Sequence, residues 1–441
     1  MKQKTFKKTA IGEIPEGWGE FSLQDLIDIK HGFAFKGEYF TDEPEEDILL
    51  TPGNFNIGGG FKANKLKYYR GEYPKEYILG PGDIIITMTD LSKNGDTLGY
   101  PARVPAINGM RYLHNQRLGL VNIKSNQIDK DFLYWLLRTR DYQRFIVNSA
   151  SGSTVKHTSP TRIQEYTFVA PSPIQEQRAI AKILSDLDAK IELNRQMNKT
   201  LESIAQAIFK RWFVDFKFPD EKGKPYKSSG GKMINSELGE IPEKWGVGKI
   251  NELVQVLSGF AFKSSDFVDS GQYRLVTIKN VQDGYFEGET KDGLNALPDK
   301  MPEYCKLQNG DILLSLTGNV GRVCLIAGEN YILNQRVAKL SSVNKINYGF
   351  VYLLFRQNEI LTMLGNLSSG TAQQNLSPIK TAEINIIIPD RVIMEQFGKI
   401  VNPMFKMILD NLNQNIFLSQ IRDSLLPRLM SGKIRAIIKK V

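Results

Sequence analysis

The stretch GEIPEGWG occupies positions 12–19, and GEIPEKWG occupies positions 239–246. Seven of the eight residues are identical across a separation of 227 positions. Two copies of so specific a stretch, each with a proline and a tryptophan, indicate that the chain is duplicated. Solenoids generally need three or more repeats, so a pseudo-two-fold arrangement is the natural alternative for two.

Further matches follow the first one in the same order along both halves. They are HGFAFK (31–36) with SGFAFK (258–263), GDIII (82–86) with GDILL (310–314), LHNQRL (113–118) with ILNQRV (332–337), FLYWLLR (132–138) with FVYLLFR (350–356), SASGSTVKHTSP (149–160) with LSSGTAQQNLSP (367–378), and EQ at 176–177 with EQ at 395–396. Between these matches, roughly at 41–80 and 268–305, the halves look unrelated. We therefore expect one scaffold that carries two different inserts.

Each half reads as a block of mixed secondary structure followed by a long helix. The Gly-Asp turns at 82–83 and 310–311 lead into short apolar runs, which favours strands. Residues 132–147 and 350–364 instead repeat apolar side chains every three to four positions, as amphipathic helices do. The expected class is α+β, with two duplicated mixed blocks joined by two long antiparallel, coiled-coil-like helices.

Beyond Pro173 an apolar stripe continues without internal Gly or Pro, which predicts a helix of about 40 residues. A weaker stripe follows in the second half, through Ile400, Met407 and Ile421, with Pro403 near its start. Asn194, Asn198, Asn411 and Gln414 fall in the middle of the two stripes, where buried amides can fix one register. The residues expected to pair the helices are Ile180, Leu184, Leu187, Ile191, Leu201, Ile208, Met404, Leu418 and Leu425.

These patterns divide the chain into six parts. They are a first mixed block at 1–172, a first long helix at 173–217, a linker rich in Gly, Ser, Lys and Pro at 218–237, a second mixed block at 238–390, a second long helix at 391–430 and a basic tail at 431–441.

Composition limits the class of protein. Hydrophobic content is 41% and charged content 24%, which are ordinary values for a globular protein. No run of 18 apolar residues occurs, so we expect a cytoplasmic protein. The net charge of +9 favours a polyanionic partner, yet residues 391–441 alone hold 9 Lys and Arg against 3 Asp and Glu. Any nucleic-acid surface on the two blocks must therefore be a local patch.

Signatures of catalysis are missing from the sequence. It has no GxxxxGK[ST] phosphate loop, no paired histidines and no CxxC pair, so neither an ATP site nor a metal site is expected. LPDKMPEYCK (297–306) only superficially resembles a nuclease metal triad, because two residues separate Glu303 from Lys306 instead of one. We expect no catalytic residue.

The candidates for DNA contact come from two motifs that occur in both halves. Lys36 and Lys263 follow the aromatic pair of GFAFK and could bind phosphate, while the phenylalanines pack in the core. The polar loops could bind phosphates or base edges, and ordinary solvated loops are the equal alternative. Their candidate residues are Ser153, Thr154, Lys156, His157, Thr371, Gln373, Gln374 and Asn375. The repeated NQR could satisfy buried backbone or contact DNA or a partner.

Taken in order and in duplicate, these motifs resemble the specificity subunit of type I restriction–modification enzymes. The resemblance covers essentially all 441 residues and includes LLPRLMSGKI (425–434) near the end. It implies that each mixed block is a target recognition domain that reads one part of a bipartite double-stranded DNA target. It also implies that the long helices set the spacer and dock two methyltransferase subunits and the restriction subunits.

The resemblance implies no cofactor in this chain, with S-adenosylmethionine, ATP and Mg expected on the partner subunits. Two other classes of function stay open at this point. One is a duplicated scaffold that assembles proteins without reading DNA, and the other is a nuclease that acts alone. Sequence-selective DNA binding with the methyltransferase partner would exclude the first, and magnesium-dependent cleavage by the lone chain would establish the second.

Overall fold

The computed structural model describes residues 6–9, 12–63, 66–106, 109–343, 348–368 and 375–436. The chain forms two compact units, Met1–Ala189 with Ser419–Val441, and Lys190–Leu418. Among the described residues, no helix combines the length and the apolar character that a membrane span requires. The fold is α+β, as predicted, and each unit is built around two sheets.

The first unit holds a four-stranded sheet and a five-stranded sheet. The former has the order β4 (Ile27–His31), β13 (Leu118–Ile123), β9 (Ile84–Thr87), β11 (Pro101–Arg103). The latter has the order β5 (Phe40–Thr41), β7 (Lys67–Tyr69), β6 (Asp47–Leu50), β12 (Arg111–His114), β8 (Ile78–Leu79). Paired ribbons are β1 (Phe6–Thr9) with β2 (Gly12–Pro15), β3 (Trp18–Ser22) with β15 (Thr167–Pro171), and β10 (Thr89–Asp90) with β14 (Lys156–His157). The short helices are α1 (Leu23–Leu26), α2 (Lys130–Leu136), α3 (Arg140–Asn148) and α4 (Pro160–Gln164).

The second unit repeats this plan. Its first sheet has the order β19 (Val254–Ser258), β28 (Val337–Ser342), β25 (Ile312–Ser315), β26 (Val323–Leu325). Its second sheet has the order β20 (Val268–Asp269), β24 (Asp292–Leu294), β21 (Tyr273–Val276), β27 (Tyr331–Leu333). Paired ribbons are β16 (Met233–Ser236) with β17 (Gly239–Pro242), β18 (Gly246–Lys249) with β29 (Asn385–Ile388), and β22 (Val281–Gln282) with β23 (Tyr285–Phe286). The short helices are α6 (Tyr348–Leu354), α7 (Asn358–Leu367) and α8 (Pro378–Ala382).

The duplication extends to strand order and register. In the first unit β12 runs parallel to β6, with Leu113 opposite Leu49. In the second unit β27 runs parallel to β21, with Ile332 opposite Leu275. Since these strands lie inside or beside the segments whose sequences look unrelated, the inserts share a fold that their sequences conceal.

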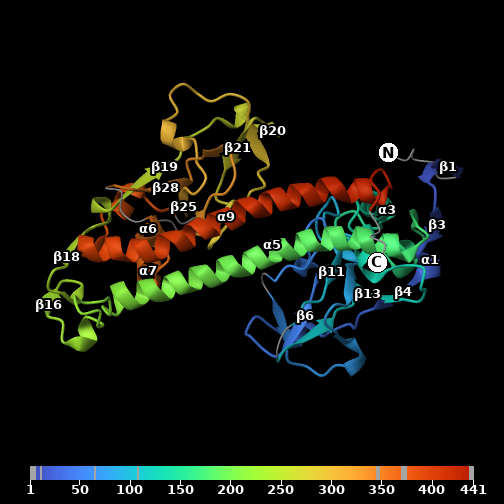
Figure 1. Ribbon diagram of the computed structural model, residues 1–441, viewed down its shortest axis with the longest axis horizontal. Coiled ribbons are helices and arrows are strands. Elements are labelled where there is room, and N and C mark those ends of the chain that lie inside the picture. The colour runs from blue at the N-terminus through green and yellow to red at the C-terminus, as the bar shows by residue number, and fades with distance from the viewer. Residues whose placement is uncertain are drawn as a thin grey trace. The chain divides into compact units, whose positions relative to one another are not determined.

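Two long helices complete both units. Helix α5 spans Ile174–Phe209 and ends in a π-helical turn at Lys210–Val214, while α9 spans Arg391–Met430 and continues through Pro403. Within each unit a section of α5 (green) lies beside a section of α9 (red) and runs in the opposite direction (Figure 1). Their inner faces enter the cores, with Ile180 and Leu184 in the first unit and Phe397 and Val401 in the second.

The buried face of α9 differs from the one that the sequence pattern predicts. Ile400, Met407 and Ile421 are 40%, 46% and 48% exposed, so the stripe drawn through them is wrong at these three positions. The buried positions of α9 follow those of α5 by 217 residues, as Phe397 follows Ile180 and Ile408 follows Ile191. The matched EQ pairs are also not equivalent. Glu176 and Gln177 are buried and hydrogen-bonded, whereas Glu395 and Gln396 are exposed.

The segment at 218–237, expected as a linker, is ordered and packed. The ring of Phe218 stacks between Tyr226 and Trp245, with centroids 4.7 and 5.0 Å away, and Phe218 is 4% exposed. Trp245 belongs to the second GEIPEKWG stretch, so this segment covers the tryptophan of that stretch. It is thus a part of the second unit. Gly, Ser, Lys and Pro dominate its composition, but its aromatic side chains determine its packing.

Candidate nucleic-acid interface

The GFAFK and NQR motifs lie side by side in both units. In the first, the backbone N–H of Phe33 donates to the His114 carbonyl at 2.8 Å, and Gln116 N–H donates to the Phe33 carbonyl at 2.9 Å. A Cβ on Gly32 would lie 2.1 Å from the Asn115 carbonyl oxygen, which explains the glycine. Gly259 makes the same approach to Asn334, at 2.3 Å. Each unit therefore builds one junction from the two motifs.

These junctions present basic side chains to solvent. Lys36 and Lys263 are exposed, as are Arg117 and Arg336 of the NQR turns. Within the described part of the chain, none of the four cations takes part in an ion pair. An unpaired, exposed cation on a rigid turn suits contact with a phosphate. The arginines were not among the candidate residues, although their place in a repeated motif was a usable signal.

The Asn of NQR has a local role. Asn115 is 8% exposed, and its Oδ1 accepts the backbone N–H of Arg117 at 3.0 Å. Its neighbour His114 is fully buried, and its Nε2–H donates to the Leu118 carbonyl at 2.9 Å. Burial lowers the pKa of His114 to about 4, with smaller contributions from Lys30 and His31. The imidazole is therefore neutral at ordinary pH and belongs to the core.

The polar loop of the first unit is a small closed turn. Ser151 and His157 exchange two backbone hydrogen bonds of 3.0 and 2.9 Å, and His157 Nδ1 lies 3.2 Å from Thr89 Oγ1. Ser153 and Thr154 are exposed at its tip, and Lys156 is half-buried. The structure thus brings the four candidates of this loop together.

The corresponding loop of the second unit has its base in the same place. Asn375 bridges Thr317, and Leu376 N–H donates to the Leu316 carbonyl at 2.7 Å. Thr317 and Asn375 are the counterparts of Thr89 and His157 in the aligned motifs. Thr371, Gln373 and Gln374 lie outside the described residues.

Each unit also contains a buried asparagine that closes a loop by hydrogen bonds. The sequence comparison does not reveal this residue, because it lies inside the divergent inserts. Asn54 is 1% exposed, and its Oδ1 accepts from Thr51 N at 2.9 Å while its Nδ2 donates to the Lys62 carbonyl at 3.2 Å. Asn280 is 3% exposed and does the same, with Thr277 N at 2.8 Å and the Glu287 carbonyl at 2.8 Å. Thr-x-x-Asn therefore closes the base of one loop in each unit.

The predicted helix-pairing residues lie on the inner faces of the long helices to different depths. Ile180, Leu184 and Ile191 are buried, whereas Leu187, Leu201, Ile208, Met404, Leu418 and Leu425 are half-buried. Between them the amides pair across the helices, with Asn194 Nδ2 2.9 Å from Asn415 Oδ1 and Asn411 Nδ2 2.8 Å from Asn198 Oδ1.

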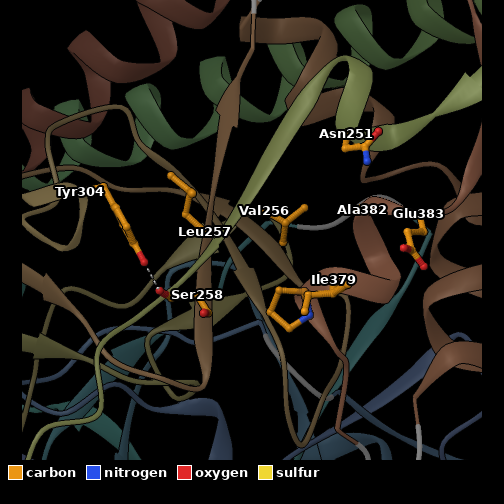
Figure 2. Close-up of a pocket in the computed structure, with 9 residues that line it drawn as sticks. Asn251, Val256, Leu257, Ser258, Tyr304, Ile379, Ala382 and Glu383 are labelled. Carbon is orange, nitrogen blue, oxygen red and sulfur yellow. Dashed lines mark hydrogen bonds between the residues drawn. The ribbon is translucent and has the colours of Figure 1, made fainter. Parts of the chain in front are cut away.

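Figure 2 shows a hollow of the second unit between β19, Tyr304 and α8. Tyr304 donates its hydroxyl to the Ser258 carbonyl at 3.0 Å, and Val256, Leu257 and Ile379 supply apolar surface. Glu383 is the one carboxylate among the residues that line it, beside no histidine or cysteine. Those residues hold no nucleophile with an adjacent base, and the described residues contain no cluster of three or more His, Cys, Asp or Glu that could hold a metal.

Comparison with known proteins identifies the family. The model of the type I restriction modification DNA specificity domain matches residues 15–203 and 242–416, which is most of the chain and once in each half. The chain belongs to the specificity-subunit family of type I restriction–modification enzymes.

Two specificity subunits illustrate the similarity. The MjaIX specificity subunit of Methanocaldococcus jannaschii is 27% identical over 98% of this chain and 96% of its own. The HindI specificity subunit of Haemophilus influenzae is 27% identical over 73% of this chain and 81% of its own. The crystal structure of the S subunit from M. genitalium shares the fold, with a TM-score of 0.50 at 18% identity over 94% of this chain and 96% of that chain.

The two units share some residues and differ in others, and this difference bears on how a specificity subunit could distinguish DNA sequences. Both units share GFAFK, NQR, the Thr-x-x-Asn anchors and a helical sequence motif whose last residue is Arg138 or Arg356. The loops that these residues hold differ in sequence, as do the tips at 153–155 and 371–373. Identical residues in two copies cannot distinguish two DNA sequences, whereas divergent ones can.

Proposed function

We propose that this chain is the non-catalytic DNA-reading subunit of a type I restriction–modification complex, and that each unit reads one part of a bipartite target. The observation that carries the proposal is the repeated frame with divergent loops. The constant junctions, with exposed Lys36 and Arg117 or Lys263 and Arg336, suit the phosphate backbone, which has no sequence of its own. The divergent loops are proposed to contact the bases.

Helices α5 and α9 are proposed to set the distance between the two half-sites and to dock the methyltransferase and restriction subunits. The support is their length and their fixed register. A helix rises about 1.5 Å per residue, so the 36 residues of α5 span roughly 54 Å, on the order of 16 base pairs. A spacer of that rigidity suits a target whose halves must be read at one separation.

Chemistry is assigned to the partner subunits, on which S-adenosylmethionine, ATP and Mg are expected. The experiment that tests the whole proposal is to express the chain with its methyltransferase partner and to map methylated sites across a genome. We expect a split target with two defined halves and an unread spacer of constant length. Methylation without sequence preference, or methyl transfer by the chain alone, would contradict the proposal. Binding of the partner without any DNA selectivity would favour the protein scaffold.

A further inference from the structure

In the first unit, one buried arginine joins the insert loop to the long helix. Arg138 follows α2 and has a side chain that is 7% exposed. Its Nε–H donates to the Gly58 carbonyl at 2.9 Å, and its Nη1 lies 2.6 Å from Asp188 Oδ2 on α5. Its guanidinium also lies over the Trp135 ring, 4.4 Å from the centroid. Loop, domain helix and long helix thus meet at a single side chain.

The second unit has the same junction at the equivalent residue. Arg356 ends the matching helical motif, with a side chain that is 14% exposed. Its Nε lies 2.9 Å from Glu202 Oε1 on α5, and its Nη1 donates to Asp283 Oδ1 at 2.5 Å. Asp283 precedes Gly284 in the turn between β22 and β23, so this arginine also holds the insert loop against α5.

Both insert loops are also held by an equivalent backbone hydrogen bond to a strand of the first sheet. Gly60 N–H donates to the Pro101 carbonyl at 2.8 Å, and Gly284 N–H donates to the Val323 carbonyl at 2.8 Å. Pro101 and Val323 are equivalent first residues of β11 and β26. With the Thr-x-x-Asn anchors at the base, each loop is fixed at three points. Its tip is nevertheless open, because Ile57 is 73% and Tyr285 50% exposed.

A rigid base under an open, divergent tip is what a base-reading loop requires, because a side chain discriminates bases only if its position is fixed. Resting on the proposed function, we propose that the loops at 55–61 and 281–289 are DNA-reading elements, in addition to the polar loops, and that Arg138 and Arg356 are their positioning residues. Each arginine holds its own loop in place on α5. Removal of one therefore relaxes the reading of one half-site and leaves the other intact.

The test uses the chain in complex with its methyltransferase partner and DNA duplexes that carry the mapped target. Rates of methylation are compared between the target and duplexes with a single base change in one half or the other. For Arg138→Met we expect the discrimination in one half to fall by roughly tenfold, about the weight of one well-read base pair, with the other half unchanged. For Arg356→Met we expect the reverse.

Two further variants separate positioning from folding. In Gly59→Ala, the new Cβ would lie 2.8 Å from Arg138 Cγ at a φ of +87°, so the loop shifts while the Arg138–Asp188 ion pair remains. It should reproduce the effect of Arg138→Met even if that variant fails to fold. Arg178→Met is the matched control, because Arg178 also links α5 to the domain, through Asp129 at 3.3 Å, but is 68% exposed and lies on no insert loop.

The outcomes are distinct. Loss of discrimination in one half only, with faster amide exchange at 55–61 and unchanged exchange in β9, supports the inference. Unchanged discrimination in folded Arg138→Met or Gly59→Ala, or an equal loss in both halves, overturns it. A wild-type complex that methylates without selectivity would instead overturn the proposed function itself.

Discussion

Asn194 on α5 donates a side-chain hydrogen bond of 2.9 Å to Asn415 on α9, and Asn411 on α9 donates one of 2.8 Å to Asn198 on α5. Asn411 and Asn415 follow Asn194 and Asn198 by the same 217 positions. Each helix therefore donates one of the two hydrogen bonds and accepts the other. One antiparallel register is favoured, because a slip of one helical turn would preserve at most one of the two amide pairs.

The pairing can be measured by a double-mutant cycle on Asn198 and Asn411. Asn411→Ala leaves the Asn198 oxygen without its partner, which should lower the free energy of unfolding by about 1–3 kcal/mol. The double variant Asn198→Ala/Asn411→Ala should cost less than the sum of the single ones by about 1 kcal/mol. The free energies come from denaturant unfolding and amide exchange in the second unit. Strict additivity would mean that the two amides do not interact.

His114 gives the first unit a specific acid sensitivity. Its folded pKa of about 4 lies below the unfolded value of about 6.5, so its contribution to stability is complete above pH 6.5 and is lost as the pH falls towards 4. The loss is at most about 3 kcal/mol. The second unit has Leu333 at the equivalent position.

His114→Leu copies that second-unit residue and should remove this part of the pH dependence. Amide exchange in β9 and β13, compared between pH 7 and pH 4.5, measures the effect, and β25 and β28 of the second unit provide the internal control. An acid sensitivity of the first unit that is the same in the variant would show that protonation of His114 is not its cause.

The packing of α5 in the first unit is tested by two neighbouring residues. Leu184 is fully buried in the core, while Ile183 beside it is 38% exposed. Leu184→Asp should lower the free energy of unfolding by about 3 kcal/mol or more, because it buries a charge without a partner. Ile183→Asp should change it by less than about 1 kcal/mol. Equal effects in denaturant unfolding would be incompatible with the packing described.

The sequence predicts the duplication well, because turns and buried motifs require particular residues that can be recognised in both halves. Gly32 and Gly259 must be glycine where another backbone passes at van der Waals distance, so GFAFK survives in both halves. The inserts hide their common fold for the opposite reason. Few residues repeat in them at a common offset, among them Thr51 and Asn54 with Thr277 and Asn280, and so few matches in about 40 residues do not stand out.

The errors also have physical causes. The apolar pattern of the second helix predicts a buried stripe through Met407 and Ile421, yet both side chains are exposed, and exposed apolar residues are common on protein surfaces. Arg138 and Arg356 end a visible motif, yet their carboxylate partners are Asp188 and Glu202, which lie at different positions of one helix. Sequence matching between halves cannot find partners that the halves do not share.

The spacer role of the helices is tested by insertions in both at once, after Ala189 in α5 and after Leu418 in α9, which keep the asparagine pairs intact. Four residues add about 6 Å, close to two base pairs, and turn each helix only about 40° beyond a full turn. We expect an active complex whose target is one or two base pairs longer. Seven residues add about three base pairs, which rotate DNA by more than about 100°, and should largely abolish activity. Tolerance of seven but not four would show that the heptad register dominates.

The central claim is that each unit reads its own half-site, and an exchange of one reading block tests it most directly. Residues 23–166 can be replaced by the block of another family member, since Ser22 and Thr167 are paired neighbours on β3 and β15 and the junctions fall together. Methylated sites are then mapped across the genome of cells that carry the exchanged chain with its partners. The account predicts one altered half-site, with the other half and the spacer unchanged. Alteration of both halves, or of neither, would contradict it.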